Sequence, residues 1–187
     1  MPADELGRKI IFVLLGLAIA TAVFILVARW GKMRKEERPP VVQEVPGETR
    51  TITVYYGSRD AANLVEETRE ITSSGRLEDE VGEAVNALLE KPQDDALVSA
   101  IPPGTRIERV YWVEDEETLY LDFNRALTAN HPGGSVSEYF TIKVILKTVS
   151  ANFPQVAMVQ LLVSGYPVET IAGHYGVSEP LDVRKWR

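Results

Sequence analysis

The sequence contains no cysteine. This absence excludes disulfide bonds, zinc sites built from thiolates and cysteine nucleophiles. It also excludes an anchor made through a lipid-modified N-terminal cysteine. The compartment stays open, because a chain without cysteine is compatible with either side of a membrane.

Groups that commonly carry catalysis are also few. The only histidines are His131 and His174, and both lie in expected loops beside glycine or proline. Asp122 ends an expected strand, where we interpret it as a turn or capping group. Ser164 precedes Gly165 without the G-x-S-x-G pattern of a nucleophile elbow. We therefore predict that the protein is not an enzyme, with no catalytic residue, no cofactor and no metal site.

Positive charge is scarce after residue 38. Residues 39–187 hold 13 Lys and Arg against 23 Asp and Glu, a net charge of −10. A nucleic-acid-binding domain needs a basic surface to meet phosphates, so nucleic acid is excluded as a partner. The acidic stretches EDEVGE and EDEE do not match a calcium-binding loop, and we interpret them as solvated faces.

One long apolar run is present, IIFVLLGLAIATAVFILVA at residues 10–28. At about 1.5 Å per residue, a helix of this length comes close to the roughly 30 Å hydrocarbon core of a bilayer. We predict a transmembrane helix over residues 10–28 that follows a short tail at residues 1–9. A cleaved signal peptide is the alternative, although its apolar region would be shorter, about 7–15 residues.

Residues 29–50 form a predicted linker that is first basic and then rich in proline. Five cations fall between residues 29 and 38, and we expect them to meet lipid headgroups. The prolines that follow favour a stiff, extended chain over a folded element. The linker therefore separates the membrane from a globular domain at residues 51–187.

The domain shows two kinds of apolar spacing. Alternation predicts strands at residues 51–56, 64–71, 105–113, 118–123 and 155–165, of which the third and fourth form a hairpin around EDEE. Helical spacing predicts helices within residues 73–92 and from Ser135 to about residue 152. Residues 166–187 show no clear period. The order β-β-α-β-β-α-β predicts an α+β fold, a single mixed sheet with two helices packed on one face.

The stretch NHPGGSVSEYF, residues 130–140, places two glycines before an expected helix, as a phosphate-binding loop does. A P-loop would have a lysine after its last glycine, and none is present here. Ser135 and Glu138 instead match a capping box, in which both side chains bond to backbone N–H groups at the helix start. Glu138 also places negative charge where an anion would bind. We interpret the stretch as a helix start.

The sequence resembles the GerMN domain family, of the sporulation and spore germination type, over nearly all of residues 51–183. The resemblance is carried by TVYYG, LVEETREI, EAVNALLEKP, LVSAIPPGTRIERVYW, LYLDFNRAL, GGSVSEYFTIKVILKTVSANFPQVAMVQLLVSG and EPLDV. It implies an α+β module outside the cytoplasmic membrane, anchored by a helix or a lipid, with no catalytic set. Many relatives are lipoproteins and some carry two copies. This chain shows one copy and lacks the cysteine, so its anchor must be the helix.

Together these features predict a single-pass protein of the inner (cytoplasmic) membrane with an extracytoplasmic C-terminal domain. The cations after the helix oppose this orientation, but large domains translocate despite flanking charge. The expected function is a non-catalytic interaction or assembly module of the bacterial cell envelope, which binds envelope proteins or copies of itself.

Two alternative functions stay open. One is an envelope hydrolase with carboxylates about 5–9.5 Å apart. The other is glycan or small-ligand binding through Tyr55, Tyr56, Tyr111 and Trp112.

Overall fold

The computed structural model describes residues 21, 48–60 and 63–186. The predicted tail at residues 1–9, the predicted transmembrane helix at 10–28 and the linker up to residue 47 lie outside the described residues, apart from Thr21. Within the described part of the chain, no helix has the length and apolar character needed to cross a bilayer.

The strands form two separate sheets. The first sheet contains β1 (Thr49–Ser58), β2 (Leu64–Thr72) and β3 (Leu97–Val98), in the order β2-β1-β3. The second contains β4 (Ile107–Val113), β5 (Thr118–Phe123), β6 (Met158–Val163) and β7 (Tyr166–Pro167) in that order, and β8 (Leu181–Asp182) also pairs with β6. β5 and β6 run parallel, and every other described pair is antiparallel.

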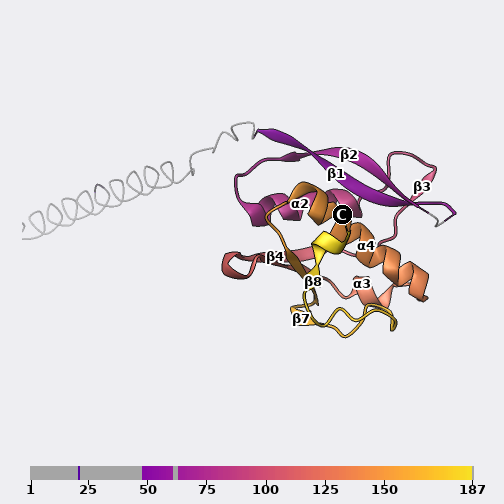
Figure 1. The fold of residues 1–187 in the computed structure, drawn as a ribbon. Coiled ribbons are helices and arrows are strands. Elements are labelled where there is room, and N and C mark those ends of the chain that lie inside the picture. The colour runs from indigo at the N-terminus through magenta and orange to yellow at the C-terminus, as the bar shows by residue number, and fades with distance from the viewer. Residues whose placement is uncertain (1–20, 22–47, 61–62, 187) are drawn as a thin grey trace, which may run out of the picture. The chain divides into compact units, whose positions relative to one another are not determined.

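The two long helices lie between the sheets. They are α2 (Leu77–Leu89) and α4 (Ser135–Asn152), and the shorter elements are α3 (Ala126–Ala129) and the 3₁₀ turns η1 (Glu114–Glu116) and η2 (Val183–Trp186). Helix α2 contacts β1 and β2 on one side and β4 on the other (Figure 1). Helix α4 is buried around most of its circumference, as expected for a helix enclosed by other layers.

The α+β class is thus confirmed, but the prediction of one mixed sheet with both helices on one face is wrong. The sequence supplies two hairpins, β1–β2 and β4–β5, and nothing in their local patterns says whether they join. On the side of β1 opposite β2, β3 pairs only with Gly57 and Ser58. Helix α4 lies along the rest of that side, so that side meets a helix and not a strand of the second sheet.

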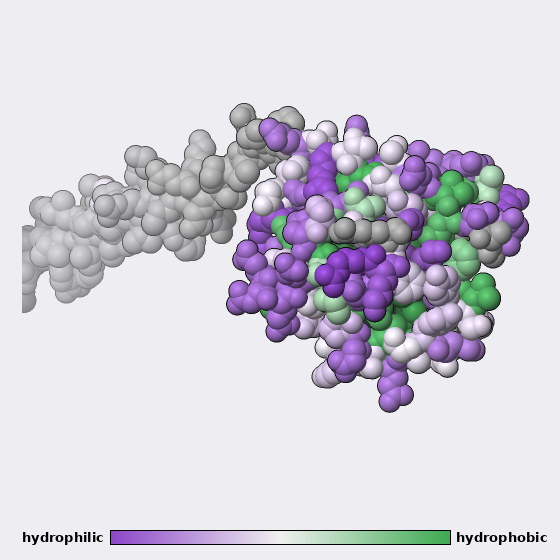
Figure 2. All heavy atoms as spheres, viewed as in Figure 1, coloured by the Kyte–Doolittle hydropathy of each residue, from purple (hydrophilic) through white to green (hydrophobic). Residues whose placement is uncertain are grey.

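Most predicted elements are confirmed within a few residues of their bounds. The EDEE segment connects β4 to β5, and Glu117 ends it in the left-handed region with a φ of 47°. The tail that lacks a period holds two short strands and a 3₁₀ turn. Figure 2 shows hydrophilic residues over much of the visible face of the domain, with hydrophobic residues in smaller patches between them.

The core extends through all the layers. Its largest fully buried side chains include Tyr56 from the first sheet, Phe123 from the second and Phe153 just after α4. Burying a side chain of this size contributes on the order of 1.5–3 kcal/mol. The hydroxyl of Tyr56 donates to the carbonyl of Ala87 at 3.0 Å, so its polar group is satisfied inside the core.

Candidate functional site

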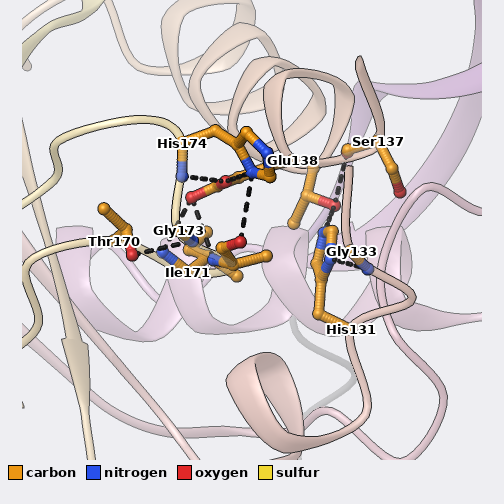
Figure 3. Close-up of polar contacts among 10 residues, drawn as sticks. His131, Gly133, Ser137, Glu138, Thr170, Ile171, Gly173 and His174 are labelled. Carbon is orange, nitrogen blue, oxygen red and sulfur yellow. Dashed lines mark hydrogen bonds and ion pairs between the residues drawn. The ribbon is translucent and has the colours of Figure 1, made fainter. Parts of the chain in front are cut away.

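A fully buried carboxylate lies where the first turn of α4 meets the loop of residues 168–177 (Figure 3). Glu138 accepts hydrogen bonds at 2.9 Å from the backbone N–H groups of Ile171 and Ala172 through Oε1, and of His174 through Oε2. The Nδ1 atom of His174 lies 3.3 Å from the same Oε2 and 3.1 Å from the carbonyl of Ala172. Two acceptors around Nδ1 assign the proton of this ring to that nitrogen.

The surroundings of Glu138 keep it ionised. Burial by itself would raise its pKa, but the backbone N–H groups of Ala172, His174, Tyr175 and Ile171 outweigh burial and hold the pKa below its usual value. A general acid in an enzyme needs the opposite shift, with a pKa raised toward the working pH. The geometry therefore makes Glu138 an anchor for the 168–177 loop.

The predicted capping box is wrong. Helix α4 begins at Ser135 as expected, but the residue in the capping position is Gly134, with a φ of 86°, and no side chain caps the helix. Glu138 turns away from its own helix start toward the loop. Four N–H groups of a distant loop give the buried carboxylate more hydrogen bonds than the single local donor of a capping box would.

His131 lies beside the same helix start and has different partners. Its Nδ1 accepts the N–H of Gly133 at 3.0 Å, and its Nε2 lies 3.1 Å from Oγ1 of Thr141. Because Nδ1 accepts, the ring proton is assigned to Nε2 and the imidazole is neutral. Burial lowers the pKa of His131 and outweighs the nearby charge of Glu138, which acts in the opposite direction.

The two histidines therefore serve separate contacts. His131 holds the turn before α4, and His174 caps the loop that encloses Glu138. Among the residues that the structure describes, no group of three His, Asp or Glu side chains is arranged to hold a metal ion.

Asp122 is also buried, on β5, and its role as a turn-capping group is confirmed. Its Oδ1 accepts the N–H of Gly165 at 2.7 Å. Ser164 and Gly165 form the two-residue turn between β6 and β7, with φ values of 53° and 84°. Two positive φ angles are typical of the tight hairpin turn that fits strand twist, so Ser164 lies in a hairpin and not in a nucleophile elbow.

The four aromatic residues named for ligand binding do not form one surface. Tyr56 is in the core, Tyr55 and Trp112 are partly buried, and Tyr111 is exposed. This separation follows from the alternation of side chains along β1 and β4.

Two open grooves, each of about 530 Å³, were not foreseen from the sequence. One lies beside the start of α4, with Val98, Val136 and Phe140 in its walls. The other lies between α2 and β4 and has an acidic lining. Each groove joins segments that are distant in the chain, so no local motif could have indicated it.

The chain matches one family model by sequence, and solved structures share its fold. A family model described as "Germane: Sporulation and spore germination" matches residues 53–169. No protein with a curated description matches the chain. A solved structure of a "putative lipoprotein" from Clostridium perfringens is 20% identical with a TM-score of 0.52, over 76% of this chain and 92% of that one.

The tandem GerMN domains of the sporulation protein GerM from Bacillus subtilis are 19% identical with a TM-score of 0.55. That match covers 78% of this chain and 49% of the tandem chain, so this chain spans about half of the tandem protein. Identities this low show a shared fold, and the family model supplies the relationship by sequence.

Proposed function

This chain belongs to the Germane family of sporulation and spore germination domains, and we propose that it is a non-catalytic interaction module of the bacterial cell envelope. In this proposal residues 10–28 tether it to the cytoplasmic membrane, and the domain lies outside that membrane. Its partners are envelope proteins. The similarity in fold to a described lipoprotein and to a sporulation protein supports an envelope role.

The proposal that the domain is non-catalytic rests on the hydrogen bonds of Glu138. It is the buried carboxylate closest to a histidine, and its oxygens are occupied by backbone N–H groups of the 168–177 loop. The same holds for Oδ1 of Asp122, which holds the β6–β7 turn. Acids that shape loops in this way support a domain that acts through its surface.

Protease shielding tests the location. Full-length protein with a C-terminal tag is expected to lose the tag when protease is added to spheroplasts with an intact inner membrane. A cytoplasmic tagged protein in the same cells should stay protected. A tag that is degraded only after the inner membrane is broken would place the domain in the cytoplasm and refute the proposed topology.

Two assays separate an interaction module from a hydrolase, crosslinking for a partner and incubation with cell-wall polymer for turnover. Capture from native membranes after crosslinking is expected to recover a specific envelope protein, and the same capture with an unrelated tethered domain should not. The purified protein is expected to release no soluble fragments from cell-wall polymer. Turnover that disappears in Glu138→Gln or Asp122→Asn, with the fold intact, would establish the hydrolase alternative instead.

A further inference from the structure

The groove between α2 and β4 follows the edge of a strand. Its walls include four consecutive β4 residues, Ile107 to Val110, together with the exposed side of α2. Consecutive residues of a strand point to opposite faces of the sheet. A groove that meets all four of them therefore runs along the backbone edge of β4.

That edge has no strand partner among the described residues. β4 is the first strand of its sheet and pairs only with β5. The register also skips Glu108, because Ile107 lies opposite Phe123 and Arg109 opposite Asp122. An unpaired edge presents backbone N–H and C=O groups that an extended peptide can extend into a further strand.

Gly82 forms part of the floor of this groove, in the middle of α2. Glycine inside a helix costs about 1 kcal/mol relative to alanine. Its φ is not positive, and an added Cβ would meet only Cγ2 of Val110 at 3.9 Å, an ordinary contact. Neither the backbone nor the packing of the domain requires glycine here, whereas a side chain would narrow the groove.

The groove is acidic. Four carboxylates line it, Glu78, Asp79 and Glu83 on α2 and Glu108 on β4. One cation, Arg109 on β4, also lines the groove, and its guanidinium donates to the hydroxyl of Tyr111 at 3.2 Å. Asp79 forms an exposed pair with Arg76, with Nε and Oδ2 3.6 Å apart. Within the described part of the chain, Glu78, Glu83 and Glu108 have neither an ion pair nor a side-chain hydrogen bond. Glu108 interacts electrostatically with the neighbouring Arg109. The two unpaired carboxylates on α2, Glu78 and Glu83, complement a cationic ligand.

We propose that this groove is the docking site for an extended, lysine- and arginine-rich segment of a partner protein. The segment adds to the edge of β4 through its backbone, and its cations lie beside Glu78 and Glu83. The proposal deepens the proposed function, on which it rests, by giving the interaction module a site and a partner chemistry. A second copy of this domain fits poorly, because the domain itself is strongly acidic.

Binding can be measured with the full-length chain in nanodiscs of zwitterionic lipid and a fluorescent peptide in which lysine alternates with threonine or valine. We expect saturable binding by anisotropy. The double variant Glu78→Gln/Glu83→Gln should weaken it roughly tenfold. The matched variant Glu66→Gln/Glu70→Gln changes two exposed carboxylates of β2, which ends the first sheet, and should change binding less than about twofold. Equal effects of the two variants, or no binding, would overturn the proposal.

Two further measurements separate strand addition from attraction of charge alone. A peptide of the same charge with N-methyl groups at alternate positions cannot donate to a strand edge, so it should bind at least about tenfold more weakly. Gly82→Ala should raise the denaturant midpoint of the free protein, whereas Gly82→Leu should block the peptide. Undiminished binding of the methylated peptide, or binding unaffected by Gly82→Leu, would refute docking on β4.

The peptide-binding experiment and the protease-shielding experiment can fail independently of each other. Loss of peptide binding would refute the groove and leave membrane topology and crosslinked partners as measured. A cytoplasmic location would refute the proposed envelope role while the anisotropy result stands.

Discussion

The side-chain amide of Asn152 pairs with both backbone groups of Thr53. Its Oδ1 accepts the Thr53 N–H at 2.8 Å, and its Nδ2 donates to the Thr53 carbonyl at 2.6 Å. The last residue of α4 thus imitates a neighbouring strand at the edge of β1. Arg50 adds a hydrogen bond to the Asn152 carbonyl at 2.6 Å. These contacts join the first sheet to the end of α4, the helix that the other layers enclose.

We expect Asn152→Ala to lower the free energy of unfolding by about 1–3 kcal/mol, because it leaves two backbone groups of Thr53 without their partner. Urea unfolding followed by circular dichroism measures the change. Asn86→Ala is the control, since Asn86 is exposed on α2, and it should stay within about 0.5 kcal/mol. Equal losses in the two variants would show that the Asn152 contacts do not stabilise the domain.

Replacing Glu138 with glutamine should loosen the tail of the domain. Glu138→Gln keeps the shape of the side chain but removes the charge that accepts N–H groups from Ile171, Ala172 and His174. We expect a loss of about 1.5–3 kcal/mol, with faster hydrogen exchange at those three amides. Glu179→Gln, an exposed change in the same tail, should do neither. Unchanged exchange at residues 171–174 in Glu138→Gln would contradict the anchoring role.

The same carboxylate makes the domain sensitive to acid. The pKa of Glu138 is below its usual 4.5 in the folded protein, because backbone N–H groups outweigh burial. The unfolded chain therefore takes up the proton first, so this stabilisation is complete above about pH 4.5 and is lost as the pH falls through the folded pKa. The difference in stability between wild type and Glu138→Gln should narrow from pH 5 toward pH 3. A difference in stability that stays constant from pH 5 to pH 3 would rule out a lowered pKa for Glu138.

His131 should produce a second pH effect in a higher range. Burial holds its pKa below the usual 6.5 in the folded protein. The unfolded chain again binds the proton first, so stability is complete above about pH 6.5 and falls as the pH drops toward the folded pKa. Proton–carbon NMR can follow both imidazoles, because the chain has only two histidines. We expect His131 to titrate below 6.5, and His131→Gln to flatten the stability profile between pH 7 and 5.

Protonation of His131 would place a hydrogen on Nδ1 and remove the acceptor for the Gly133 N–H. The amide of Gly133 should therefore shift with the same midpoint as the imidazole, while His174→Gln leaves that midpoint unchanged. A Gly133 amide that is insensitive to pH would refute the assigned tautomer.

Local pattern predicted the elements well where a segment interacts mainly with its own neighbours. Alternation placed β1, β2, β4 and β5, and the hairpin around EDEE is confirmed. Helical spacing placed α2, and the start of α4 at Ser135 is confirmed. The turn role of Asp122 was also correct, because an acid at a strand end is well placed to accept a nearby N–H.

Long-range partners account for the errors. The S-x-x-E pattern predicts a local cap, but in the structure four N–H groups of residues 171–175 bind Glu138 in place of the helix start. The single predicted sheet became two because α4, through Asn152, occupies the edge of β1. Residues 171–175 are far from Glu138 in the sequence, and Asn152 is far from β1. The local spacing of apolar residues therefore could not predict either contact.

The sequence alone determined the acidic charge of the domain, the family resemblance, the order of its principal strands and helices and the lack of cysteine chemistry, since these follow from composition and from neighbours within a few residues. Tertiary structure alone decided the division into two sheets, the burial of Glu138 and the meeting of α2 with the free edge of β4. The first two depend on the distant backbone groups that the side chains of Asn152 and Glu138 reach, and the third depends on how α2 packs beside β4. All three are settled only when the whole chain packs.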